Sequence, residues 1–404
     1  MKPIMGTPIR APHVDLIYFD AGGGHRAAAG ALATVLARRY PEWRVTLVNL
    51  RDLLEPLDFI QRLTGMRVEG FYNGLLKANL TAGIGPMLRV MHAIIRRMHP
   101  WMVPTLAAQW ALRRPNLVVS LIPHFNRAIF EGLRTADADL GRPTTPMATI
   151  LTDLADYPPH FWIEPQEQFV ICGTAAACNQ ALAAGLPPEL ILRTSGMIVR
   201  PEFYEPPTTS QVTALRRLGL DPERPTGLVM FGGFGSRRME LIARRVADAG
   251  LQTQLIFLCG RNQDLRDRLA ALDLPYRHHI EGFTSAVPDF MRRADFFIGK
   301  PGPGSISEAL VTGVPVILER NALTMVHERF NTDWVLHEGV GLVVRSFSAI
   351  DHAITLLLDT ERLAALRRRI HMSENRAIFE LPAMLEAVMT GTRETQPFAL
   401  KLRA

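Results

Sequence analysis

Residues 296–318 read FFIGKPGPGSISEALVTGVPVIL, and this stretch contains the pattern that decides the fold. A short apolar run at 296–299 ends at a glycine-rich turn, a helical stretch follows at 305–311, and a second apolar run occupies 314–318. Strand, glycine turn, helix and strand in this order are typical of a parallel sheet whose strands are connected by helices.

The same pattern occurs in both halves of the chain. The apolar run at 14–19 ends in DAGGG and precedes a helical stretch at 25–40; the run at 226–231 ends in GGFG and precedes one at 237–249. Further strands are expected at 45–50, 116–122, 147–152, 168–172 and 253–259, and a further helix at 174–184. This alternation predicts two doubly wound α/β domains with Rossmann-like topology.

The length of 404 residues also favours two domains, because a single hydrophobic core stops growing well below that size. Residues 201–211 are polar and rich in proline, which is typical of a linker. We therefore expect an N-terminal domain at 1–200 and a C-terminal domain at 212–404 that includes terminal helices at 348–389. A deep cleft between the two domains is the expected ligand site.

The charge balance indicates an anionic partner. Lys and Arg number 45 against 39 Asp and Glu, a formal net charge of +6. Nucleic acid is the partner least expected, because the arginines are spread over both halves without interleaved aromatic residues. Phosphate-bearing ligands and acidic lipid remain as the expected anionic partners.

The cysteines and the apolar segments indicate a compartment. Cys172, Cys178 and Cys259 have no metal-ligand spacing, so free thiols in a reducing compartment are expected. The first 13 residues hold no apolar stretch of signal-peptide length, and no run approaches the roughly 20 residues of a membrane span. We expect a cytoplasmic protein that binds a membrane peripherally, if it meets one.

Residues 57–112 interrupt the alternation of strands and helices and form a predicted insertion. Apolar residues occur there at helical spacing, namely Met87, Leu88, Met91, Ile94, Ile95 and Met98. Basic residues alternate with them, namely Arg89, Arg96, Arg97 and His99. Two tryptophans follow, Trp101 and Trp110. A basic amphipathic helix flanked by aromatics is typical of an anchor at an anionic membrane surface. A core-packed helix with a solvated basic face fits the same periodicity.

Glycine turns at the ends of the first strands of each half predict a binding site for an anion. Gly23 and Gly24 let a ligand approach the backbone at the start of a helix, whose N–H groups favour negative charge. Three residues form a similar turn in the second half: Gly232, Gly233 and Phe234. Neither turn has the G-x-G-x-x-G pattern of dinucleotide-dependent oxidoreductases. His25 beside the first turn is a candidate general base, although a single histidine can also be structural.

The turn at 299–305 is the sharpest motif. Gly302 and Gly304 open a helix whose first N–H groups, around Ser305, suit a diphosphate, and the Glu308 carboxylate could accept two hydrogen bonds from a ribose diol. Alternatively, Ser305 and Glu308 form an S-x-x-E capping box that requires no ligand.

Three aspartates stand outside these glycine turns. Asp153 follows the expected strand at 147–152, where the carboxyl end of the strand meets the cleft, and its structural role would be to cap the next turn. Asp137 and Asp139 have the spacing of a metal-binding pair, but they fall in a polar segment and are expected to be solvated. No metal site is predicted.

The segments GGGHR, LTDLADYPPHFW, CGTAAACNQALAAGLPPELI, SGMIVRPEF, GGFG, GKPGPGSISEALVTGVPVIL and HERFN follow one another along the chain. In this order they resemble the monogalactosyldiacylglycerol synthase type of family 28 glycosyltransferases, over roughly residues 14–345. They are similar, more distantly, to the enzyme that adds N-acetylglucosamine to the lipid-linked peptidoglycan precursor. The resemblance implies a GT-B fold, a UDP-sugar bound mainly by the C-terminal domain and an acceptor bound mainly by the N-terminal one. It also implies inversion at the anomeric carbon without a tightly bound metal, and no cofactor.

Carried over by position, the resemblance makes His25 the base and Glu308 the ribose ligand. The region around Asp153 lines the acceptor side in the resembled family, so Asp153 is a second candidate for the base or a residue that orients His25. Glu328 and Asn331 would lie near the donor sugar and its phosphates. The family usually has glutamine before that glutamate, whereas this chain has His327. The departure leaves the identity of the sugar open, and His327 can also be structural.

The expected activity is therefore inverting transfer of a sugar from a UDP-sugar to a membrane lipid, which the resemblance suggests is diacylglycerol. Three alternatives remain: transfer to another lipid or polyprenyl-linked acceptor, a UDP-sugar epimerase with the same cleft, and a lipid or nucleotide binder without catalysis. The sequence favours no particular oligomeric state.

Overall fold

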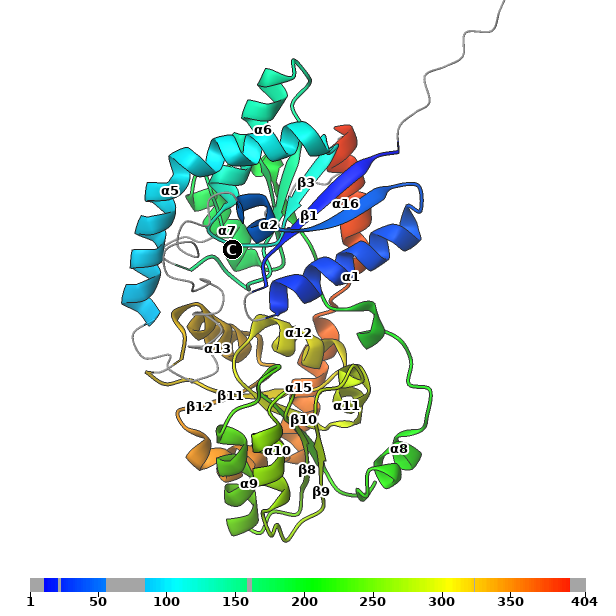
Figure 1. Ribbon diagram of the computed structural model, residues 1–404. Coiled ribbons are helices and arrows are strands. Elements are labelled where there is room, and N and C mark those ends of the chain that lie inside the picture. Colours follow the sequence, from blue (N-terminus) through cyan, green and yellow to red (C-terminus); the bar gives the residue numbers. More distant parts are fainter. Residues whose placement is uncertain (1–10, 21–22, 56–83, 158–161, 323, 393–404) are drawn as a thin grey trace, which may run out of the picture.

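The computed structural model describes residues 11–20, 23–55, 84–157, 162–322 and 324–392 (Figure 1). Two six-stranded parallel sheets form the centres of two domains, with helices on the faces of each sheet. The chain therefore has two Rossmann-like domains, as predicted.

The N-terminal sheet has the strand order β2-β1-β3-β4-β5-β6. Its strands are β1 (His13–Tyr18), β2 (Arg44–Asn49), β3 (Leu117–Ser120), β4 (Met147–Ile150), β5 (Phe169–Cys172) and β6 (Ile191–Arg193). The helices between them are α1 (Gly24–Arg39), α2 (Leu50–Leu54), α5 (Ile84–Arg113), α6 (Asn126–Asp139) and α7 (Ala175–Ala183). Because β1 pairs with both β2 and β3, the order reverses at β1, and α1 starts at that switch point.

Strand β1 is apolar along its length because both of its faces are covered. Leu16 contacts the core cluster that contains α1, whereas Ile17 contacts the one that contains α5 and α6. Both side chains have no exposed surface. A parallel strand buried on two faces reads as a continuous apolar run, which is why the sequence identified it.

The C-terminal sheet has the order β12-β11-β10-β7-β8-β9. Its strands are β7 (Thr226–Met230), β8 (Gln254–Leu258), β9 (His278–Glu281), β10 (Phe296–Gly299), β11 (Val316–Glu319) and β12 (Gly341–Val344). The helices are α8 (Gln211–Arg217), α9 (Arg238–Asp248), α10 (Gln263–Ala270), α11 (Val287–Arg293), α12 (Pro303–Val311), α13 (Val326–Glu338), α14 (Ile350–Leu357) and α15 (Thr360–Met372). The reversal at β7 and β10 places two glycine turns side by side at the carboxyl ends of these strands.

The final helix, α16 (Ala377–Thr390), belongs to the other domain. Ile378, Leu381 and Leu385 are fully buried in the core cluster of the N-terminal sheet, against α1. The chain crosses back to the first domain before α16, where the Ser195 Oγ accepts a hydrogen bond of 2.7 Å from the Arg376 backbone N–H. The prediction that all the terminal helices belong to residues 212–404 as one domain is therefore wrong for α16.

Helix α5 runs unbroken through Pro100 and Pro104, which the sequence indicated as interruptions. Figure 1 shows the helix changing direction along its length, as expected where prolines remove backbone hydrogen bonds. From Met102 onward the helix is a core element, because Met102, Leu106 and Trp110 are buried. Trp110 is therefore not an interfacial aromatic residue, and only the N-terminal part of α5 can serve as an anchor. Residues 57–83 of the predicted insertion lie outside the described residues.

Helix α6 ends at Asp139, in the segment predicted to be a solvated loop. Asp139 is exposed, but Asp137 is buried and accepts hydrogen bonds from the Thr145 backbone N–H at 2.7 Å and from Arg142 at 2.5 Å. Asp137 thus holds the α6–β4 connection, and the prediction that it is solvated is wrong.

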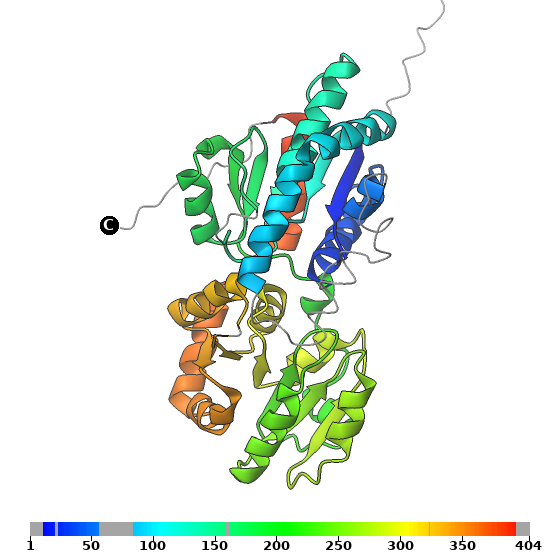
Figure 2. The same ribbon diagram turned by 60° about the vertical axis from the view of Figure 1, so that its left-hand side comes forward.

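The carboxyl edges of the two sheets face each other (Figures 1 and 2). The Tyr157 and Phe330 rings meet edge to face with centroids 6.3 Å apart, and Met325 packs into an N-terminal core cluster beside Trp162. Both contacts join the β4–β5 connection of the first domain to the start of α13 in the second.

None of the helices described is both long enough and apolar enough to cross a membrane. Cys172, Cys178 and Cys259 are buried free thiols, as predicted.

Candidate active site

His25 is the second residue of α1, directly after the first glycine turn. The helix is preceded by Gly23, which has a left-handed conformation with φ of 82° that glycine adopts without strain. A Cβ atom at Gly23 or Gly24 would meet no atom within 4 Å, so the space beside the turn is open. The start of α1, where His25 lies, is therefore accessible.

The His25 ring is oriented by residues that follow β4. Its Nδ1 lies 3.0 Å from the Thr152 Oγ1, and its ring meets the Trp162 indole edge to face, with centroids 5.8 Å apart. The hydrogen bond and the ring contact together hold the imidazole at the carboxyl edge of the sheet.

The Trp162 side chain contacts both Asp153 and His25. The indole Nε1 donates a 2.8 Å hydrogen bond to the Asp153 Oδ2, and the buried Asp156 carboxylate accepts backbone N–H bonds from Trp162 and Ile163. Asp153 thus holds the Trp162 indole, and its role as a base or as a residue that orients His25 stays a prediction.

The turn after β7 brings Gly232, Gly233 and Phe234 to the matching edge of the C-terminal sheet. The Phe234 side chain is 38% exposed. The Gly233 carbonyl accepts a 2.8 Å hydrogen bond from the Arg261 backbone N–H, which ties this turn to the end of β8.

The turn after β10 differs from the predicted capping box. Helix α12 begins at Pro303 with Gly302 as its N-cap, and no side chain caps it. Ser305 therefore lies inside the first turn of the helix and Glu308 in the second turn, so the capping-box alternative is wrong. Gly304 and Ser305 nevertheless remain at the helix N-terminus, where backbone N–H groups suit a phosphate.

Glu308 is the carboxyl group in this region with the most altered acidity. Burial raises the pKa of Glu308 to about 7, and the positive charge of Arg200 opposes that rise. Arg200 directly precedes the predicted linker at 201–211. The interaction between Arg200 and Glu308 therefore places the start of the linker close to the predicted donor-binding turns.

Lys300 lies between the two C-terminal glycine turns. Its Nζ donates a 2.9 Å hydrogen bond to the Glu328 Oε1, and its Cε would lie 4.0 Å from a Cβ at Gly232 and 3.5 Å from one at Gly302. Glu328 is only 5% exposed, so the ion pair is largely shielded on that side. The buried Asn331 donates a 2.8 Å hydrogen bond to the Pro301 carbonyl.

These contacts show that Glu328 and Asn331 hold the 300–302 turn in place. The His327 side chain lies outside the described residues. Four residues near the site have no role predicted from the sequence: Lys300, Thr152, Trp162 and Arg200. Lys300 could have been identified because it is a cation next to a glycine turn that suits a phosphate.

Within the described ranges, no three His, Cys, Asp or Glu side chains are grouped so that they could hold a metal ion.

Residues 228–350 match the glycosyltransferase family 28 C-terminal domain. The matched range contains every donor-side candidate from Gly232 to Asn331, whereas His25 and Asp153 lie before it. The predicted resemblance to family 28 is thus confirmed.

Two curated relatives resemble a larger part of the chain. Monogalactosyldiacylglycerol synthase 1 of Arabidopsis thaliana is 28% identical over 357 residues, covering 85% of this chain and 64% of the relative. Monogalactosyldiacylglycerol synthase of Spinacia oleracea is 27% identical over 367 residues, covering 85% and 66%. The chain therefore spans somewhat less than two thirds of the length of these relatives.

Solved structures agree with the predicted GT-B fold. MurG of Acinetobacter baumannii superposes with a TM-score of 0.56 at 15% identity, covering 93% of this chain and 99% of that one. A Staphylococcus aureus MnaA structure with UDP superposes with a TM-score of 0.57 at 14% identity, covering 94% and 97%. At such identities the likeness supports the fold alone.

Proposed function

We propose that this protein is an inverting glycosyltransferase that moves a sugar from a UDP-sugar to a membrane lipid, with diacylglycerol as the acceptor. The observation that carries the proposal is the His25 imidazole, held by Thr152 beside an open glycine turn at the start of α1. Figure 1 shows the start of α1 directed toward the second domain, whose sheet carries two further glycine turns at the ends of β7 and β10. The names of the curated relatives support the lipid acceptor.

The proposed reaction is a single displacement. His25 accepts the proton of the acceptor hydroxyl, and that oxygen forms a bond to the anomeric carbon as the bond from this carbon to the UDP oxygen breaks. The attack comes from the face opposite UDP, so the configuration inverts. UDP leaves with the electron pair of the broken bond.

The leaving diphosphate gains negative charge, which the C-terminal turns are suited to stabilise. The first turn of α12, at Gly304 and Ser305, offers backbone N–H groups that suit a phosphate, and the Lys300 side chain lies between the Gly232 and Gly302 turns. Glu308 would accept hydrogen bonds from the ribose diol, while Glu328 keeps Lys300 in place between the turns. Neither a metal nor a cofactor has a role in this proposal.

The N-terminal part of α5 is the proposed membrane contact. Ile94 is 43% exposed and Trp101 50% exposed, and the Arg97 guanidinium lies over the Trp101 ring at 5.1 Å. A basic residue near an anionic membrane contributes about 1 kcal/mol, so a few arginines with exposed apolar side chains suffice for reversible attachment. We propose peripheral attachment to the cytoplasmic face of a membrane.

The activity test uses the full chain with diacylglycerol liposomes and several UDP-sugars, scored by UDP release and by the mass of the lipid product. His25→Ala should lower kcat by a factor of about 100 to 10,000, as loss of a general base does. The matched control Glu205→Gln changes an exposed residue of the linker and should leave kcat unchanged. Conversion of the sugar nucleotide without lipid would instead indicate an epimerase, and equal turnover by His25→Ala would remove His25 as the base.

The membrane test needs surface substitutions, because Ile95 and Met98 pack against the N-terminal core. Combined Arg97→Glu and Trp101→Ser should weaken partitioning to anionic liposomes about tenfold or more, with UDP affinity unchanged. Arg217→Glu, an exposed charge reversal on α8 in the other domain, is the matched control. Equal partitioning of both variants would show that α5 does not contact the membrane.

A further inference from the structure

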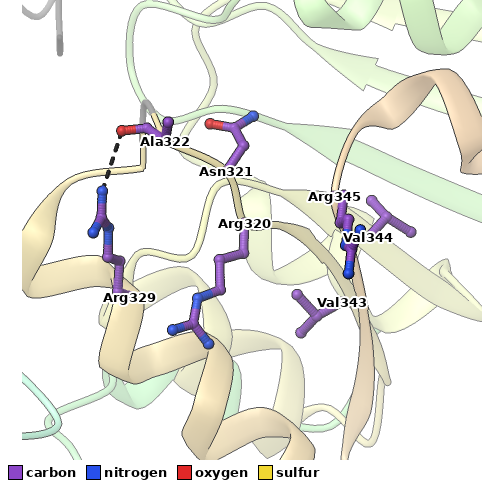
Figure 3. A pocket seen from close by; sticks show the side chains of 7 residues that line it. All are labelled: Arg320, Asn321, Ala322, Arg329, Val343, Val344 and Arg345. Atoms are coloured by element: carbon purple, nitrogen blue, oxygen red, sulfur yellow. Dashed lines mark hydrogen bonds between the residues drawn. The ribbon is translucent and has the colours of Figure 1, made fainter.

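A hollow of about 560 Å³ lies at the carboxyl ends of β11 and β12 (Figure 3). Among the described residues, three arginines from three different elements line it and no acidic residue does: Arg320, Asn321, Ala322, Arg329, Val343, Val344 and Arg345. Arg320 directly follows β11, Arg345 directly follows β12, and Arg329 belongs to α13. Guanidinium groups from separate elements around one hollow indicate a site for an anion.

The charge of these arginines is only partly balanced. Arg320 pairs with Asp333, and Arg329 donates hydrogen bonds to the Ala322 and Thr324 carbonyls at 3.2 Å, which fixes its position without neutralising it. Arg345 is exposed and forms no ion pair or side-chain hydrogen bond among the residues that the structure describes. About two positive charges therefore remain to attract a ligand.

The hollow lies next to the proposed diphosphate site. Strand β11 is the neighbour of β10, whose end carries the Gly302 turn, and adjacent strands lie only about 4.8 Å apart. Arg329 directly follows Glu328, which is paired with Lys300 between the turns. The proposed diphosphate site and the hollow are thus separated by one or two strand spacings.

The proposed ribose ligand lies on the other side of this turn. Glu308 belongs to α12, and Figure 1 shows α12 on one side of the carboxyl edge and α13 with β12 on the other. A sugar nucleotide whose ribose contacts Glu308 and whose diphosphate rests on the Gly302 turn therefore extends its sugar towards α13 and the hollow.

We infer that the donor sugar carries a carboxylate, so that the donor is a UDP-uronic acid whose carboxylate binds the arginines of this hollow. The inference rests on the proposed function and assigns the substrate class of the same site. A guanidinium binds a carboxylate through two parallel charge-assisted hydrogen bonds, which a neutral hexose hydroxymethyl group cannot form. A uronate forms these hydrogen bonds with the arginines, whereas with a neutral sugar the guanidinium groups remain hydrogen-bonded to solvent.

The test compares UDP-glucuronate and UDP-galacturonate with UDP-glucose and UDP-galactose. Calorimetric binding to the full chain without lipid comes first, because it does not depend on the acceptor. One uronate donor should bind about tenfold to a hundredfold more tightly than its neutral counterpart, the range expected for a charge-assisted pair. Equal or weaker binding of both uronates would overturn the inference.

Variants identify the groups responsible. Arg345→Ala should reduce the preference for the uronate, as a ratio of affinities and of kcat/KM, about tenfold, and Arg345→Lys should restore only part of it. Arg368→Ala, which removes an exposed arginine from α15, is the matched control and should keep the wild-type ratio. If Arg345→Ala weakens uronate and neutral donors equally, the arginines hold the diphosphate and the inference is wrong.

The two proposals fail in different ways. Transfer to diacylglycerol from a neutral donor alone would leave the glycosyltransferase proposal standing and overturn the uronate inference. Tight uronate binding without transfer to any lipid would overturn the lipid acceptor and retain the assignment of the donor.

Discussion

Replacing Glu308 by glutamine should stabilise the protein and weaken its binding of UDP. Burial raises the pKa of Glu308 from 4.5 to about 7. Each pH unit between these values corresponds to about 1.4 kcal/mol, so ionised Glu308 lowers the free energy of unfolding by about 3 kcal/mol at pH 8. Glutamine carries no charge, so Glu308→Gln should gain up to that amount at pH 8.

The sign and the pH window follow from the two protonation equilibria. Between pH 4.5 and 7 the folded chain holds the Glu308 proton more tightly than the unfolded chain does, so wild-type stability falls as pH rises through this window. Above pH 7 the penalty is constant, and below pH 4.5 it vanishes. The advantage of Glu308→Gln should therefore be small at pH 5 and full at pH 8.

Urea unfolding at pH 5 and pH 8 measures this difference, with Glu205→Gln as an exposed control whose stability should match wild type at both values. Calorimetry of UDP binding gives the second readout. Only the ionised carboxylate accepts both ribose hydrogen bonds, so wild-type affinity should rise as pH increases through 7, and Glu308→Gln should bind about tenfold more weakly without that rise. An equal stability difference at pH 5 and pH 8, or unchanged UDP affinity, would refute the reasoning.

Two other substitutions and one chemical reaction test separate features. Arg113→Met removes the Arg113 hydrogen bonds of 2.6 and 2.7 Å from the fully buried Asp15 and leaves it only the His13 Nε2 at 3.0 Å among the described partners, so urea unfolding should show a loss of about 3 kcal/mol. Gly260→Ala places a Cβ 2.4 Å from the Gly233 carbonyl oxygen at a φ of 61°, so calorimetry should show weaker UDP binding together with lower stability. Burial raises the pKa of Cys259 to about 11, so its alkylation at pH 8 should be at least about a hundredfold slower in the folded than in the urea-unfolded chain.

The sequence predicted the strands that are buried on both faces and end in glycine. Strands β1 and β7 are of this kind, because their side chains are buried on both faces of the sheet. Strand β9 reads HHIE and β6 has only three residues, ILR, so neither shows a period or an apolar run. Both strands are defined by pairing with β8 and β5, which is information that no local window contains.

Helix α5 shows how packing overrides a local signal. Pro100 and Pro104 each remove a helical hydrogen bond, and from the sequence they predict a break. Fully buried Leu106 and Trp110 and the long contact with α6 stabilise the helix through that region. The prolines change the direction of the helix axis but do not end the helix.

The candidate site was predictable where a local motif marks it. Glycine turns after strands and a histidine beside one of them are visible in the sequence, and so is the acidic residue on α12. The partners are not, because Thr152 is 127 positions from His25, and Glu328 is 28 positions from Lys300. Sequence spacing identifies which residues have suitable chemistry, and the fold decides which of them meet.

The return of α16 to the first domain has a consequence for folding during synthesis. Residues 211–372 supply all six strands of the second sheet and the helices around it, and they are complete before α16 is made. The first domain, although translated earlier, lacks the cover over α1 until Ile378, Leu381 and Leu385 emerge from the ribosome. The usual order, in which the N-terminal unit folds first, is thus reversed at the final step. A pause or a premature stop before residue 377 would leave the apolar face of α1 open to chaperones and proteases.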